Sequence, residues 1–80
     1  MNRAKFMELH ASCVTALGKY VVEAGKTTQM LSECSGEPLP FMDRFRLMSQ
    51  CIVEDDAHVA YLGIKSLLYR AARSGYGSTN

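Results

Sequence analysis

The segment ECSGEPLP, residues 33–40, contains both prolines of the chain and interrupts it more strongly than any other stretch. Proline cannot continue a helix, and Gly36 suits the left-handed position just past a helix end. On both sides of this segment apolar residues recur every three or four positions, as in a helix, and neither side alternates as a β-strand would. The spacing therefore predicts two long helices joined by one short loop.

We expect one all-α domain over residues 1–80, with helix one at about 3–32, a loop at 33–39 and helix two at about 40–73. The glycine- and serine-rich segment 74–80 is predicted to be a flexible tail. A short loop between helices of equal length predicts an antiparallel two-helix hairpin. If the turn is centred near Gly36, facing residues have numbers that sum to about 72, which places Tyr20 near Ile52.

Charge and cysteine content argue against several classes of protein. Nine basic and eight acidic residues leave a net charge of +1, whereas a nucleic-acid-binding protein usually has a clear basic excess. The first ten residues mix charged with apolar side chains, so we expect neither a signal peptide nor a membrane span. Three widely spaced cysteines without a CxxC pair favour reduced thiols, and we expect a cytoplasmic protein.

Helix two is predicted to be apolar on two opposite faces. One face carries Phe41, Phe45, Met48, Ile52, Val59 and Leu62, and we assign it to packing against helix one. The opposite face is predicted to be an interface with another chain; its residues are Val53, Ala57, Ala60, Tyr61, Ile64, Leu67 and Leu68. A helix that is apolar on two faces is buried on both. A homodimeric four-helix bundle is the favoured arrangement because most oligomers are symmetric, and a helical protein partner is the alternative.

Small residues recur every seventh position of helix one, at Ala4, Ala11, Gly18, Gly25 and Ser32. Seven residues make nearly two turns, so these residues form one line beside the apolar face. We predict that Ala11, Gly18 and Gly25 allow another helix to pack closely. Gly25-Lys26-Thr27 resembles the end of a phosphate-binding loop, but Tyr20 occupies the position where that motif needs its first glycine.

Glu54, Asp55 and His58 are the candidate metal ligands, because residues three and four apart share a helix face. A solvated ion pair of His58 with one of these carboxylates is the simpler interpretation. Asp55 also falls between Ile52 and Val59 on the face assigned to helix one. It is therefore predicted to be a buried carboxylate that needs a partner, with Lys19 as the candidate.

Neither a nucleophile–base pair nor a cofactor motif is recognisable, so we expect no enzyme, no catalytic residue and no cofactor. The sequence predicts a small non-enzymatic protein-interaction or regulatory module that acts as a homodimeric helical bundle. The alternative is a helical bundle that binds a metal or a small ligand through Glu54, Asp55 and His58.

Overall fold

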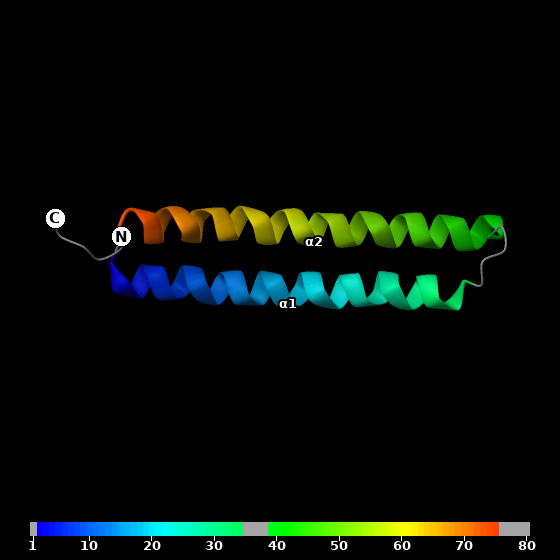
Figure 1. Ribbon diagram of the computed structural model, residues 1–80, viewed down its shortest axis with the longest axis horizontal. Coiled ribbons are helices and arrows are strands. Elements are labelled where there is room, and N and C mark those ends of the chain that lie inside the picture. Colours follow the sequence, from blue (N-terminus) through cyan, green and yellow to red (C-terminus); the bar gives the residue numbers. More distant parts are fainter. Residues whose placement is uncertain (1, 35–38, 76–80) are drawn as a thin grey trace.

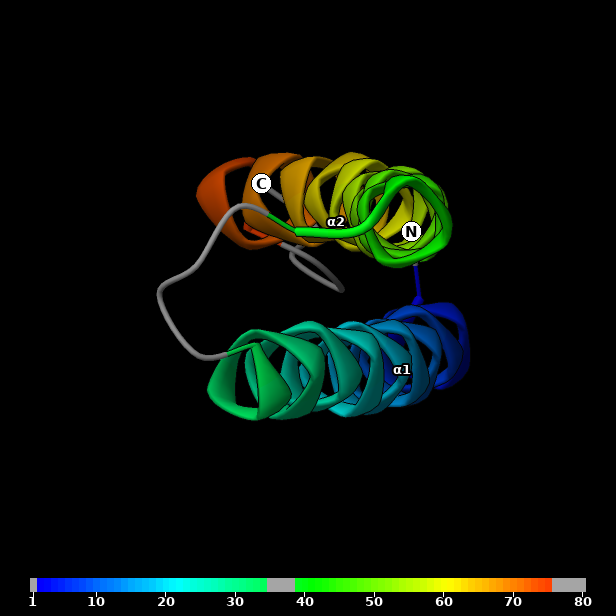
Figure 2. The same ribbon diagram turned by 90° about the vertical axis from the view of Figure 1, so that its right-hand side faces the viewer.

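A computed structural model describes residues 2–34 and 39–75, and over these residues the protein consists of two α-helices. Helix α1 spans Arg3–Glu33 and helix α2 spans Phe41–Arg73. The helices lie side by side and antiparallel over their whole length, in one layer (Figures 1 and 2). The predicted helical hairpin is thus confirmed, and each predicted helix boundary differs from the observed one by at most one residue. The predictions that concern Gly36, Pro38 and the tail beyond residue 75 lie outside the described residues.

Local hydrogen bonds explain where the helices begin and end. The Asn2 side chain caps α1, because its carbonyl oxygen accepts a hydrogen bond of 2.8 Å from the backbone N–H of Lys5. Asp43 lies in the first turn of α2 and Arg70 and Arg73 lie in its last turn, so these charges complement the helix dipole. Gly75 ends α2 in the left-handed region, with φ of 72°.

The two helices meet along a seam whose positions alternate in steps of three and four residues. We define the seam by the buried and half-buried residues that follow this spacing; the half-buried Ala24 and His58 lie beside it. In α1 these are Phe6, Leu9, Cys13, Ala16, Tyr20, Glu23, Thr27 and Met30, and in α2 they are Asp43, Leu47, Gln50, Glu54, Ala57, Tyr61, Ile64, Leu68 and Ala71. Such spacing is typical of a coiled coil. The only apolar residues buried among those described are Cys13, Ala57 and Ala71, so the core is thin.

The assignment of the two faces of α2 was wrong. Of the predicted interface, Ala57 is buried and Tyr61, Ile64 and Leu68 are half-buried in the seam, whereas Val53, Ala60 and Leu67 are exposed beside it. The face assigned to α1 is instead exposed. The physical reason is that small residues such as Ala57 let the helix backbones approach each other, while the bulky side chains of the other face would hold them apart.

The predicted pairing of the helices was also a few residues out. Glu23 contacts Gln50, a sum of 73, and Tyr20 contacts His58, a sum of 78. Ile52, predicted to lie near Tyr20, is 63% exposed. The facing helix ends, Glu33 and Phe41, have numbers that sum to 74 and not 72, so the facing residues of α2 have higher numbers than predicted.

Candidate interaction surface

The outward side of α2 carries a continuous apolar stripe. We call it the α2 outer stripe, and it consists of Phe41, Phe45, Met48, Ile52, Asp55, Val59, Leu62, Ser66 and Tyr69. Its positions alternate in steps of four and three, so they stay on one face of the helix, roughly opposite the seam. The seven large apolar side chains of the stripe are 46–69% exposed. This is the face that a second helix would be expected to cover.

A second stripe runs along α1, about 100° around the helix from the seam. We call it the α1 outer stripe, and it consists of Met7, His10, Val14, Leu17, Val21, Ala24, Thr28 and Leu31. Its large apolar side chains are 39–58% exposed. The Thr28 hydroxyl donates a hydrogen bond of 3.0 Å to the Ala24 carbonyl oxygen of its own helix. The polar atom of Thr28 is thus already paired within α1, which suits a place on an apolar face.

The accessible area of the chain is large for its mass. The hairpin measures 61 × 15 × 13 Å and exposes 6115 Å². A compact monomer of 8.9 kDa is expected to expose about 4,800 Å². The difference is about 1,300 Å² per chain, and the large apolar side chains of both outer stripes are among those exposed.

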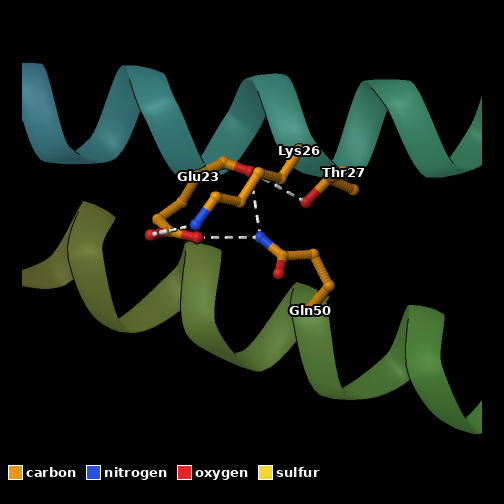
Figure 3. A network of polar contacts seen from close by, with 4 residues as sticks. All are labelled: Glu23, Lys26, Thr27 and Gln50. Carbon is orange, nitrogen blue, oxygen red and sulfur yellow. Dashed lines mark hydrogen bonds and ion pairs between the residues drawn. The ribbon is translucent and has the colours of Figure 1, made fainter.

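One polar layer joins the helices inside the seam (Figure 3). The Gln50 side-chain amide donates hydrogen bonds of 3.1 Å to the Glu23 backbone carbonyl and of 3.0 Å to the Glu23 carboxylate. The other carboxylate oxygen lies 3.4 Å from the Lys26 ammonium, and the Thr27 hydroxyl donates to the Glu23 carbonyl at 3.2 Å. Both carboxylate oxygens of Glu23 are therefore paired, as a buried carboxylate requires.

The hydrogen bond from Gln50 is the main reason why the pKa of Glu23 lies below its ordinary value. Burial acts in the opposite direction, and the charges of Lys26 and Lys19 lower the pKa further. The arrangement keeps Glu23 ionised in a seam where it is only 9% exposed. The sequence analysis missed this residue, although the spacing of Leu9, Ala16 and Glu23 would have placed it on the packed face.

Next to this layer, aromatic rings connect the helices. The Tyr20 ring of α1 stacks on His58 of α2 with centroids 4.7 Å apart, and it lies 6.4 Å from the Tyr61 ring. The Lys65 ammonium lies 5.6 Å from the centre of the Tyr61 ring, a cation–π arrangement. His58 is thus a half-buried packing residue of the hairpin.

The candidate metal ligands do not come together within the chain. Asp55 is exposed in the α2 outer stripe, so the prediction of a buried carboxylate paired with Lys19 was wrong at this residue. Glu54 is half-buried at the seam and His58 stacks on Tyr20. Within residues 2–34 and 39–75, no three His, Cys, Asp or Glu side chains are grouped so that they could hold a metal ion.

The small residues of α1 face away from α2. A Cβ atom added at Gly18 or Gly25 would meet no other atom of the chain within 4 Å, and Ala11 is exposed. The small residues of α1 therefore do not serve the packing of α1 against α2 of the same chain. The predicted close packing stays a prediction about a helix of another chain.

Comparison with known proteins returned no matching protein-family model and no significantly similar curated protein or solved structure. Within the part of the chain that the structure describes, neither helix has a stretch apolar enough to cross a membrane.

Proposed function

We propose that the protein is a non-enzymatic interaction module that acts as a homodimeric helical bundle. The observation that carries this proposal is the exposure of two apolar stripes that run the length of a hairpin with almost no core of its own. Exposed apolar patches of this extent mark interaction sites in soluble proteins. The free thiols of Cys13, Cys34 and Cys51 favour a reducing compartment, and we place the module in the cytoplasm on that ground.

The size of the surplus surface supports a dimer. If each of two chains covers about 1,300 Å², the interface amounts to about 2,600 Å², within the range of permanent homodimers. A second copy also supplies helices of the same length and the same spacing of apolar residues as the stripes to be covered. Symmetric pairs are in addition the commonest oligomers.

Light scattering over a concentration series tests the proposal. We expect a mass of twice 8.9 kDa for the natural chain. Ile52→Glu places a charge in the α2 outer stripe and should shift the mass toward that of one chain while helicity remains. Ser49→Glu, one turn away on the same helix and outside the stripe, is the matched control and should stay dimeric. A natural chain that is a stable, helical monomer at micromolar concentration would contradict the proposal.

A further inference from the structure

We propose that the dimer forms by antiparallel packing of the α1 outer stripe of one copy on the α2 outer stripe of the other. This inference rests on the proposed function and deepens it by naming which surfaces meet. The excess of about 1,300 Å² per chain over a compact monomer is comparable with the area that each partner buries in a stable dimer. Both stripes also keep the three-four spacing of a coiled-coil seam along their whole length.

Side-chain size favours α1 of the second copy over its α2 as the helix that covers the α2 outer stripe. Valine and alanine dominate the middle of the α1 outer stripe, while phenylalanine, methionine and isoleucine fill the first half of the α2 outer stripe. If the helix ends are flush, so that residue 3 of one copy lies level with residue 73 of the other, Ala24 comes level with Ile52 of the second copy. Met48 likewise comes level with Thr28, so at these two positions a large side chain meets a small one, which favours close packing.

Electrostatics disfavours the pairing of α2 with α2. Residue 55 is the midpoint of the stripe from residue 41 to residue 69, so flush antiparallel self-pairing would place the two Asp55 carboxylates against each other. The same alignment brings Arg44 level with Ser66 of the second copy, one residue from Lys65. Like charges that face each other are destabilising, and a stripe with no carboxylate avoids both contacts. The α1 outer stripe contains none.

Pairing α1 with α1 is disfavoured by what it would leave uncovered. It would bury the α1 outer stripe, which is the less exposed of the two, and would leave the α2 outer stripe in water. That stripe includes Phe41, which at 69% is the most exposed large apolar residue among those described. The row of Ala11, Gly18 and Gly25 flanks the α1 outer stripe, and a Cβ at either glycine meets nothing within the chain. That row gives the bulky α2 of a second copy room to approach.

Disulfide cross-linking tests which helices meet. In a background with Cys13→Ala, Cys34→Ser and Cys51→Ser, Val14→Cys and Leu62→Cys are made in separate chains, since flush packing places residues 14 and 62 level. The two variants are mixed, allowed to exchange and oxidised gently. We expect covalent dimer in the mixture and little in either variant alone. If the background is less helical than the natural chain, the buried Cys13 is kept and the joined cysteines are identified by peptide mass spectrometry.

The outcomes separate the pairing from the dimer itself. Antiparallel pairing of α2 with α2 would bring residue 55 level with its own copy, so covalent dimer from Asp55→Cys alone in the same background would show that pairing and overturn ours. Covalent dimer from Leu62→Cys alone or from Val14→Cys alone would show a parallel pairing of like helices and would overturn it too. A dimer by light scattering in which residues 14 and 62 do not cross-link also overturns the pairing and leaves the proposed function intact. If the cysteine-substituted background and the natural chain are both monomeric, the pairing and the proposed function are both overturned.

Discussion

Glu23 is the only acidic side chain that is buried among the described residues. It forms a polar contact between the two helices, because its carboxylate accepts a hydrogen bond from Gln50. A buried carboxylate is tolerated only where its oxygens are paired, and Gln50 and Lys26 pair both of them. Only one alignment of the helices brings Gln50 to Glu23. This layer therefore selects the register of a seam whose small apolar residues would permit several.

Acid should weaken the hairpin through Glu23. Its pKa is lowered in the folded state, so its contribution to stability is present above the ordinary value near 4.5 and is lost as the pH falls through the lowered value. We expect the urea midpoint, followed by circular dichroism, to fall between about pH 7 and about pH 3 more in the natural chain than in Glu23→Gln. Glu8→Gln, at an exposed glutamate of the same helix, should keep the natural acid response. Equal acid responses in Glu23→Gln and the natural chain would contradict this role.

Asp55 should limit how tightly the chains associate. It is the only charged residue in the α2 outer stripe, and covering that stripe would remove water from its carboxylate. Asp55→Ala is therefore expected to tighten self-association about tenfold, a difference of about 1.4 kcal/mol, in sedimentation equilibrium. Asp56→Ala removes the same charge one residue away, outside the stripe, and should change little. A similar effect of both variants would point to net charge and not to burial of the stripe.

At the scale of the helices, the two elements expose different surfaces for different reasons. Helix α2 has two opposed apolar faces, of which the seam covers one. Helix α1 has its second stripe only about 100° from the seam, with the row of small residues next to it. A helix that covers α1 would thus lie beside the seam, whereas a helix that covers α2 would lie on the side of α2 opposite the seam.

The glycines of α1 should matter for association and not for the hairpin. A Cβ atom at Gly25 would meet no atom of the chain within 4 Å, and leucine is about 1 kcal/mol more favourable than glycine in a helix interior. We therefore expect helicity to be retained or raised while self-association weakens, about tenfold or more, because the added side chain blocks close approach. Ser12→Leu, on the exposed lysine-bearing side of α1, is the control and should leave the dimer intact. Unchanged association in Gly25→Leu would show that no helix packs closely there.

The whole molecule is a rod with a thin seam, and its stability as a single chain is correspondingly small. The radius of gyration is 17.9 Å, against about 12 Å for a compact domain of 80 residues. A chain of 80 residues with so few buried apolar side chains removes little surface from water, and small domains of this kind commonly gain stability from a metal, a disulfide or a partner. In this protein a second copy is the proposed source of that stability.

Thermal unfolding should consequently depend on protein concentration. When folding and dimerisation are coupled, a tenfold rise in concentration adds about 1.4 kcal/mol per dimer, which raises the Tm by roughly 3–6 °C for a unit of two such chains. Circular dichroism melts over a hundredfold dilution series measure this. The Ile52→Glu variant, in which the α2 outer stripe carries a charge, should lose the concentration dependence. A constant Tm for the natural chain would mean that the hairpin is stable alone.

Sequence by itself determined the two helices and nearly all of their boundaries, because helical spacing and the proline- and glycine-containing break are local properties of the chain. It also determined that α2 is apolar on two faces. The tertiary structure alone decided which of these faces meets α1. Both faces of α2 carry apolar residues at helical spacing, and the outer one carries the larger side chains, so the pattern alone does not identify the face that meets α1. The decision depends on contacts across the seam, where Ala57 permits close approach and Gln50 reaches Glu23, and such contacts exist only once the helices are placed together.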